Sequence, residues 1–438
     1  MQKIASDQLR KVVGSKSVTK STIITKVITD SRKAEKGALF VAIKGDKFDG
    51  HDFVVDVLEN GCELVMVERL LPHVAADRQI VVPSTIEAYG RIAAYNRQQF
   101  KGVVIGLTGS SGKTTTKEEL KHVLSAFGKT YATSGNHNNH IGVPQTLLDM
   151  DMDADYAIVE MGMSSKGEIS QLTSYVKPDI ALVTNVYPMH IEFFESFEAI
   201  AKAKAEIFEG LTSNGIAIIN ADTNFADILQ KQAQKYTDKI ITFGKNNHYT
   251  GRLELEQDGE IQRYNAWAVL KVVEALGLDC AQAAETLKTF EALEGRGKKH
   301  ILPLPSGGCY TLIDDSYSGQ PEAMKIAIKS LSEMPCKGRK IALLGKMAEL
   351  GATSLKQHIA IGKLVADCKI DIVIGVKPEM KDMLAQLPAT TEQYYFDSRE
   401  GVVEFLQNKL LQKDDILLIK GARYSSELYK VTEALLKG

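Results

Sequence analysis

The chain has 438 residues, of which 44% are apolar and 25% charged, and its formal net charge is −2 with an isoelectric point near 6.5. This composition is typical of globular proteins with sizeable cores, and the length suggests two to four domains. The near-neutral charge gives no indication of a nucleic-acid surface or a polybasic membrane patch, so we expect neither kind of partner.

The cysteines and the first residues bear on the cellular compartment. The cysteines are odd in number and lack the paired spacing of a zinc site; they are Cys62, Cys280, Cys309, Cys336 and Cys368. This pattern predicts reduced, mostly buried thiols. The first residues lack the apolar core of a signal peptide, and no apolar run approaches the ~20 residues that a membrane-spanning helix needs. We therefore expect a cytoplasmic protein.

Residues 1–82 are expected to form a small N-terminal α/β domain. Short apolar runs at 27–29, 38–42 and 64–67 predict strands, and residues 51–60 predict a helix with one apolar face. Polar and cationic side chains at the strand ends would suit a phosphorylated ligand, since arginine binds phosphate through paired hydrogen bonds. On the residues alone, two ordinary surface loops explain them at least as well.

Residues 83–297 are expected to form a nucleotide-binding domain. After a helix at 85–100, residues 103–107 predict a buried strand, and a Gly/Ser loop then leads into a helix that begins near Lys113. Glycines let backbone N–H groups approach phosphate oxygens, and the helix N-terminus favours negative charge. Lys113 can reach the β- and γ-phosphates, and Thr114 has a hydroxyl for Mg²⁺. The order strand, loop, Gly-Lys-Thr-Thr, helix therefore predicts a P-loop.

The rest of this domain alternates apolar strands with helical stretches. The predicted strands are residues 156–160, 180–185, 215–220 and 239–243. Near-continuous apolar strands separated by helices predict a doubly wound parallel sheet with both faces covered. A last helix at 265–276 leads to a Gly-Arg-Gly stretch followed by Lys-Lys-His, which predicts a hinge.

Residues 298–438 repeat the pattern and predict a C-terminal, Rossmann-like α/β domain. Its predicted strands are residues 310–314, 340–344, 371–375 and 416–420. Helices are expected between them, for example at 321–331 and 354–368. The length of this segment suits an independent domain.

Polar residues follow several strands, at the edge where open α/β sheets bind ligands. Glu160 ends a strand and could hold Mg²⁺ near the P-loop, or it could be an exposed glutamate. His190 and Lys204, taken alone, are typical of a surface loop and a solvated helix face. Asp314 and Asp315 are adjacent at a strand end, which is unusual for structure alone because carboxylates repel each other.

In their order along the chain, these motifs resemble those of the Mur ligases, the ATP-dependent enzymes that form amide bonds in peptidoglycan synthesis. The resemblance runs from Asp30-Ser31-Arg32 to Lys420-Gly421-Ala422-Arg423, nearly the whole chain. It is closest to the member that joins D-alanyl-D-alanine to UDP-N-acetylmuramoyl-tripeptide and forms ADP. It implies three α/β domains in one chain that carries every expected group, which suggests a monomer.

The resemblance also implies a role for each matching residue. ATP would be bound by Thr108, Gly109, Ser110, Ser111, Gly112, Lys113, Thr114, Thr115, Asn138, Asn139, Asn265 and Arg296. Two Mg²⁺ ions would be held by Thr114, Glu160, His190 and Lys204, the last as a carbamate. Direct catalytic roles would fall to Lys113, Lys204, His190 and Asp315. The UDP-linked substrate would contact Ser31, Arg32, Lys44, Phe48 and Asp49, and its peptide side Tyr317, Lys420 and Arg423.

The chain departs from the family's motifs in four places. The segment between residues 243 and 265 is short, and Tyr187-Pro188 precedes His190. The last domain carries Ser318-Gly319-Gln320 and Lys346 at motif positions where the family has other residues. Three alternatives stay open: a paralogue that joins another amine or carboxylate, a degenerate ligase that acts as a binding partner, and some other P-loop kinase.

Overall fold

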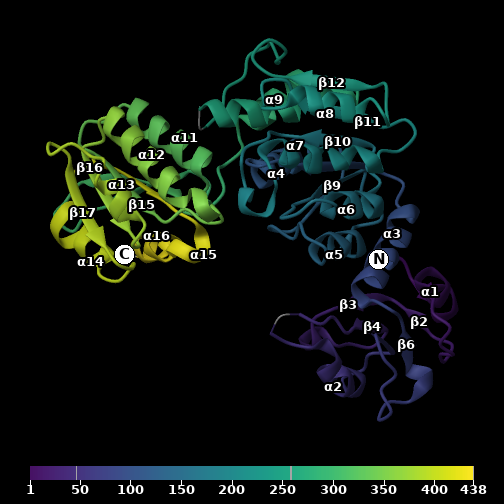
Figure 1. The fold of residues 1–438 in the computed structure, drawn as a ribbon. Coiled ribbons are helices and arrows are strands. Elements are labelled where there is room, and N and C mark those ends of the chain that lie inside the picture. The colour runs from purple at the N-terminus through teal and green to yellow at the C-terminus, as the bar shows by residue number, and fades with distance from the viewer. Residues whose placement is uncertain (46, 257–258, 438) are drawn as a thin grey trace.

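The structure is a computed structural model that describes residues 1–45, 47–256 and 259–437. The chain folds into three α/β domains, and Figure 1 shows the N-terminal and C-terminal domains joined to different sides of the central one. Within the described residues, no helix has the length and apolar character to cross a membrane. The three-domain α/β architecture expected from the motifs is confirmed.

The N-terminal domain is built on a four-stranded parallel sheet in the order β3-β4-β5-β6. Its strands are β3 (Lys26–Ile28), β4 (Ala38–Val41), β5 (Leu64–Val67) and β6 (Gln79–Val81). The other elements are α1 (Ser6–Val13), α2 (Val54–Glu59) and the antiparallel pair β1 (Ile4–Ala5) and β2 (Ile23–Ile24). The three predicted strands are confirmed, whereas α1, β1, β2 and β6 were not predicted.

The central domain is a six-stranded parallel sheet in the order β12-β11-β10-β7-β9-β8. The strands are β7 (Val103–Thr108), β8 (Thr130–Ala132), β9 (Tyr156–Glu160), β10 (Ile180–Val183), β11 (Ile216–Asn220) and β12 (Ile240–Phe243). The strand order reverses between β7 and β10, and ligands bind beyond the carboxyl ends of strands at such a point. The P-loop follows β7, so it lies at this switch point.

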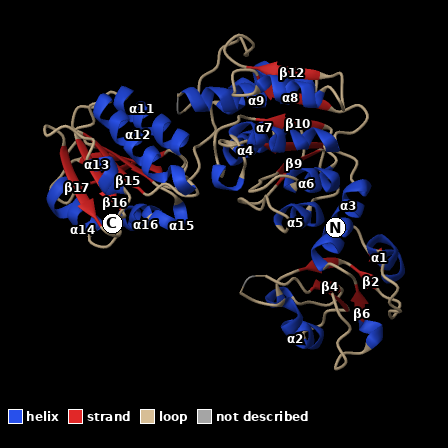
Figure 2. Cartoon of the chain, viewed as in Figure 1, coloured by secondary structure: helices blue, strands red, loops and turns tan. Residues whose placement is uncertain are grey.

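Helices cover both faces of the central sheet, as Figure 2 shows. One face packs against α3 (Thr85–Gln99), α5 (Gly142–Asp149), α6 (Glu168–Val176), α7 (Phe197–Ala205) and α8 (Ala226–Ala233). The other packs against α4 (Lys113–Leu124), α9 (Glu260–Ala275) and α10 (Cys280–Leu287). The first of these two cores continues into the N-terminal domain through α1 and α3, which joins the two domains. The predicted doubly wound sheet is thus confirmed.

The C-terminal domain has a six-stranded sheet in the order β13-β14-β18-β15-β16-β17. Its strands are β13 (Lys298–Pro303), β14 (Cys309–Asp315), β15 (Lys340–Gly345), β16 (Ile372–Val376), β17 (Glu392–Phe396) and β18 (Ile416–Lys420). Only β13 is antiparallel to its neighbour. Its helices are α11 (Pro321–Glu333), α12 (Ser354–Asp367), α13 (Met380–Leu384), α14 (Val402–Phe405), α15 (Arg423–Ser426) and α16 (Leu428–Lys437).

Three local predictions were wrong. The helix expected at 265–276 begins earlier, at Glu260. The described residues of the short segment before it form no further strand. The Lys-Lys-His stretch expected in the hinge is the start of β13, where it pairs with β14. The thiols are all free, but they are not mostly buried: only Cys62 is fully so, and Cys309 is exposed.

Candidate active site

The P-loop links β7 to α4, and its glycines leave no room for a side chain: a Cβ at Gly109 would lie 1.9 Å from Thr184 Oγ1. Gly112 has φ +78°, and a Cβ there would lie 2.6 Å from Asn265 Oδ1. A side chain at this position would therefore be strained and would displace Asn265, which α9 brings against the loop. The ammonium group of Lys113 donates to the carbonyl of Gly109 at 2.8 Å, so its side chain curls over the loop.

The chain after β10 holds the P-loop in place. The backbone N–H of Ser110 donates to the carbonyl of Asn185 at 3.0 Å, and that of Ser111 donates to Asn185 Oδ1 at 2.8 Å. The hydroxyl of Ser110 donates to the carbonyl of Tyr187 at 3.0 Å. Asn185 and Tyr187 thus position the loop, a role that we did not predict for either residue.

A small polar network stands beside the P-loop lysine. The hydroxyl of Thr114 donates to Glu160 Oε1 at 3.3 Å, and Asn138 Nδ2 donates to the same oxygen at 2.7 Å. Glu160 is 1% exposed, and its second oxygen, Oε2, is buried without a hydrogen-bond partner among the described residues. A buried carboxylate oxygen without a donor is a position that a cation would satisfy.

Lys204 lies on α7 with only 3% of its surface exposed, which overturns the expectation of a solvated helix lysine. Burial, and then the positive charge of Lys113, lower the pKa of Lys204 well below its ordinary value. Burial also lowers the pKa of Lys113, and the charge of Glu160 opposes that change. Burial close to the P-loop therefore favours the uncharged form of the Lys204 amine.

His190 contacts the C-terminal domain. Its Nδ1 lies 2.6 Å from Glu349 Oε2, and the pair joins the loop after β10 to the loop after β15. The contact with His190 holds the pKa of Glu349 below its usual value. His190 has φ +57°, a left-handed backbone conformation that is uncommon outside glycine and asparagine.

The adjacent carboxylates at the end of β14 point in different directions, because side chains alternate along a strand. Asp314 is buried and accepts hydrogen bonds from the backbone N–H of Gly295 and the hydroxyl of Ser316. Asp315 faces Lys420 on the paired strand β18, with 2.6 Å between Oδ2 and Nζ. Burial raises the pKa of Asp315, and Lys420 opposes the rise. Asp314 is thus structural, and Asp315 is available to the site.

Two arginines meet the ring of Tyr317 where the central and C-terminal domains join. The guanidinium carbon of Arg296 lies 4.1 Å from the ring centroid, and that of Arg423 lies 5.4 Å from it. The guanidinium of Arg296 also donates to Thr114 Oγ1 at 3.0 Å. Side chains from both domains therefore meet at the P-loop.

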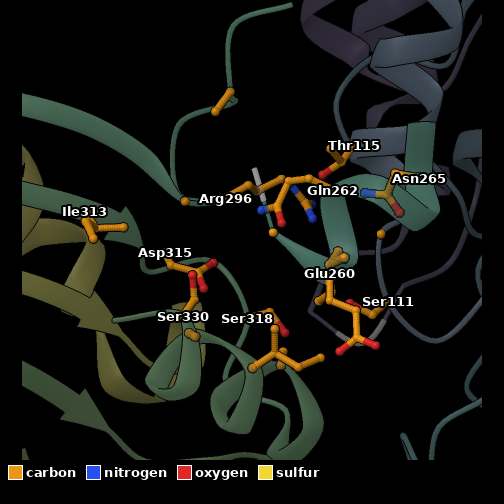
Figure 3. Close-up of a pocket in the computed structure, with 18 of the residues that line it drawn as sticks. Ser111, Thr115, Glu260, Gln262, Asn265, Arg296, Ile313, Asp315, Ser318 and Ser330 are labelled. Atoms are coloured by element: carbon orange, nitrogen blue, oxygen red, sulfur yellow. The ribbon is translucent and has the colours of Figure 1, made fainter. Parts of the chain in front are cut away.

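Two cavities open on either side of this meeting point. The first has a volume of about 290 Å³, and the predicted residues along it are Ser110, Ser111, Gly112, Lys113, Thr114, Asn138, Asn139, Glu160, His190, Arg296 and Tyr317. The second has about 170 Å³ and is lined by Ser111, Gly112, Thr115, Asn265, Arg296, Asp315, Tyr317 and Lys420. Figure 3 shows side chains of both domains around this second cavity.

Some predicted residues lie outside both cavities. Thr108 is fully buried, and the carbonyl of Gly109 accepts the hydrogen bond from Lys113. Lys204 and Arg423 line neither cavity.

The residues predicted for the UDP-linked substrate all lie in the N-terminal domain and line neither cavity; they are Ser31, Arg32, Lys44, Phe48 and Asp49. Arg32 is paired with Asp30 through two bonds of 2.9 and 2.8 Å, and Asp49 holds His51. Phe48 is 72% exposed. Asp46 of the same loop lies outside the described residues.

Two buried residues of α4 were missed. Lys117 donates to the carbonyls of Thr133 and Gly135, both at 2.7 Å, and so fixes the start of the loop that carries Asn138. Glu119 lines the smaller cavity and is 4% exposed. The four-residue spacing from Thr115 to Glu119 was a signal that could have placed Glu119 on the ligand-facing side of the helix.

The structure gives partial support for a metal site. No group of three or more histidine, cysteine, aspartate or glutamate side chains suited to a metal ion occurs among the described residues. Thr114, Glu160 and His190 do line one cavity, and Glu160 offers an unpartnered oxygen. A carbamate on Lys204 would add a second anionic ligand beside the Glu160 carboxylate, so the residues present fit Mg²⁺.

Three models of known protein families match the chain. The model described as "Mur ligase family, catalytic domain" matches residues 23–97, "Mur ligase middle domain" matches 107–275, and "Mur ligase, glutamate ligase domain" matches 304–423. The first match covers most of the N-terminal domain and continues into α3, and the other two fall within the central and C-terminal domains respectively.

Similar proteins cover the whole chain. UDP-N-acetylmuramoyl-tripeptide–D-alanyl-D-alanine ligase of Escherichia coli K12 is 34% identical, with 99% of each chain covered. A crystal structure of MurF from Acinetobacter baumannii has a TM-score of 0.90 at 28% identity, with 100% of each chain covered. MurF ligase from Thermotoga maritima in complex with ADP has a TM-score of 0.80 at 28% identity, covering 94% of this chain and 97% of that one.

Proposed function

The chain belongs to the Mur ligase family, and from this premise we propose that it joins D-alanyl-D-alanine to UDP-N-acetylmuramoyl-tripeptide in peptidoglycan synthesis. The reaction is an ATP-dependent, ADP-forming amide ligation. The observation that carries the proposal is the meeting of Lys113, Thr114 and Glu160 with Arg296 and Tyr317 along one cavity.

Each domain takes one part of the reaction. Residues 1–82 hold the uridine diphosphate end of the tripeptide substrate through Ser31, Arg32 and the loop of Lys44, Phe48 and Asp49. Residues 83–297 hold ATP, and residues 298–438 bring the amine. Because the predicted uridine-binding residues line neither cavity, the substrate must extend from its own domain to the P-loop, and domain movement completes the site.

The first chemical step activates the peptide carboxylate. One carboxylate oxygen attacks the γ-phosphorus of ATP, the bond to the β-phosphate oxygen breaks, and ADP leaves as an acyl phosphate forms. Negative charge builds on the transferring phosphoryl group, and Lys113 with the P-loop amides neutralises it. Thr108, Gly109, Ser110 and Ser111 shape this loop, and Asn265 supports Gly112.

The second step forms the amide. The amine of D-alanyl-D-alanine attacks the acyl carbon, a tetrahedral intermediate forms, and inorganic phosphate leaves with the oxygen that had belonged to the carboxylate. We assign the proton of the attacking amine to Asp315, whose pKa is raised by burial and whose carboxylate is oriented by Lys420. Tyr317 and Arg423 line the approach to this group.

Mg²⁺ fits the site as a partner of ATP. Thr114, Glu160, His190 and carbamylated Lys204 would hold two ions, with Asn138 and Asn139 beside them. When bound, the ions would screen the phosphate charges that build up during transfer. The neutral amine of Lys204 is the form that reacts with CO₂ to give a carbamate.

We further propose that the protein works as a monomer in the cytoplasm. All five cysteines are free thiols, which favours a reducing compartment. Every group assigned above comes from one chain.

The identity of the amine is the test of this function. Purified protein with UDP-N-acetylmuramoyl-tripeptide and ATP should release phosphate when D-alanyl-D-alanine is added, and should release far less with single amino acids. Release with another amine alone would indicate a paralogue of different specificity, and release with none would indicate a binding partner without catalysis.

A further inference from the structure

Glu119 is a buried acid with one carboxyl oxygen that has no hydrogen-bond partner among the described residues. It lies on α4 and is 4% exposed, and the oxygen without a partner is Oε2. Burial raises the pKa of this carboxyl well above its usual value. A neutral carboxyl offers one donor and one acceptor, and leaving both unused in a protein interior is costly.

The carboxyl lies on the cavity beside the P-loop. Thr115 and Glu119 are four residues apart, so they share one face of α4 at a separation of about 6 Å along the helix axis. Asn265 and Gln262 of α9 form a second wall, and Phe290 forms a third. Figure 3 shows Thr115, Gln262 and Asn265 grouped at one end of this cavity.

This cavity has the composition that a nucleobase requires. Phe290 supplies an aromatic ring and Leu287 an apolar surface, and bases stack on such side chains. The phosphates of a nucleotide lie at Lys113 under the proposed function. The rest of the same molecule must leave the P-loop past Ser111, Gly112 and Thr115, all of which line this cavity. A base that follows this path enters the part of the cavity that Glu119 lines.

Adenine has an edge that a buried carboxyl can bind. Its 6-amino group is a donor, and each ring nitrogen beside it is an acceptor, so one carboxyl can accept from the first and donate to the second. We propose that Glu119 is a specificity-determining residue that binds the 6-amino edge of the adenine of ATP. This inference rests on the proposed function, because it takes the nucleotide to be bound at the P-loop.

The test compares ADP with purine riboside 5′-diphosphate, which lacks only the 6-amino group, by calorimetric binding to the full chain. The wild-type protein should bind ADP roughly ten-fold more tightly, the worth of one well-made hydrogen bond. In Glu119→Met, which is of similar length, the two affinities should become equal within about two-fold. Glu119→Gln retains one donor and one acceptor and should retain the preference.

Controls separate the possible failures. Glu118→Met, one residue away and outside the cavity, should keep the wild-type preference. Because Oε2 of Glu119 has no hydrogen-bond partner among the described residues, Glu119→Met should have the same melting temperature as the wild type or a higher one, whereas loss of a purely structural residue would lower it. The inference is overturned if the wild type does not distinguish the two nucleotides, or if Glu119→Met still does. Absence of ADP binding by the wild type would instead overturn the proposed function.

Discussion

Arg296 donates a hydrogen bond to Thr114 Oγ1 at 3.0 Å, although the two residues are 182 positions apart in the chain. Arg296 lies in the connection to the C-terminal domain, and Thr114 opens the P-loop helix. The same guanidinium lies over the ring of Tyr317, which belongs to the C-terminal domain. The orientation of that domain is therefore tied to the residue that would contact the nucleotide.

Replacing Arg296 by lysine should separate charge from geometry. The ammonium group retains the charge but cannot bond Thr114 and cover Tyr317 at once. We expect kcat/KM for ATP to fall by about 10- to 100-fold, since a charge-assisted bond in a buried site is lost. Initial rates of phosphate release measure this change. Arg91→Lys, on the exposed side of α3, should keep kcat/KM within two-fold of the wild-type value. Equal kcat/KM values for the two variants would show that the Arg296 bond to Thr114 does not contribute to the reaction.

Lys117 should be needed for stability as well as for activity. In Lys117→Met the buried carbonyl of Thr133 loses its donor, at a cost of about 1–3 kcal/mol, whereas water can replace the donor at the exposed Gly135. Glu118→Gln removes only the half-exposed partner of the same lysine and should cost less than about 1 kcal/mol. Urea unfolding measures the loss of unfolding free energy in each variant, and the loss should be larger in Lys117→Met. Similar losses in the two variants would show that the bonds from Lys117 to the carbonyls are weak.

Glu119 should make stability depend on pH. Its raised pKa means that the native protein keeps a proton that the unfolded chain releases above about pH 4.5, so the native state loses stability as the pH rises. The loss is at most about 1.4 kcal/mol per pH unit between the unfolded and the native pKa. Glu119→Met lacks this proton, so its advantage over the wild type in unfolding free energy should grow from pH 5 to pH 7. Parallel curves for the two proteins would contradict the assignment.

Lys204 should make activity depend on bicarbonate. Burial lowers the pKa of its ammonium group, which favours the uncharged amine, and that amine can add to CO₂ and release a proton to give an anionic carbamate that can bind a metal ion. We expect the rate to fall in CO₂-depleted buffer and to recover when bicarbonate is restored. Lys204→Ala should lose at least about 100-fold in kcat, a typical effect of losing charge stabilisation at a phosphoryl group. Lys202→Ala, exposed on the same helix, should keep its rate and its bicarbonate response.

The sequence predicted the sheets better than it predicted the surroundings of the site. Long apolar strands such as β9 and β18 were placed to the residue, because strands buried on both faces are continuous apolar runs. The edge strands β3 and β12 were predicted, but the edge strand β13 was not: it alternates exposed and half-buried residues, and its Lys-Lys-His start is typical of a loop. The N-terminal part of α9 was not predicted, because its polar first turn resembles a linker.

The burial of charged residues could not be predicted from sequence. Lys204 and Lys117 are helix lysines like many solvated ones, and only the packing of the helices shows that both are buried. The adjacent carboxylates Asp314 and Asp315 suggested repulsion, which the strand resolves by pointing them apart. The burial of a charged side chain depends on contacts with residues far away in the sequence, so a local sequence pattern does not reveal it.

The most direct test of the account follows a labelled oxygen through the reaction. The tripeptide substrate is prepared with ¹⁸O in its terminal carboxylate and incubated with the wild-type protein, ATP and D-alanyl-D-alanine, and the released phosphate is analysed by mass. If the carboxylate is activated as an acyl phosphate at the Lys113 loop, each phosphate carries one ¹⁸O atom, and Lys113→Ala releases almost none. Phosphate free of ¹⁸O alongside amide product would contradict the account.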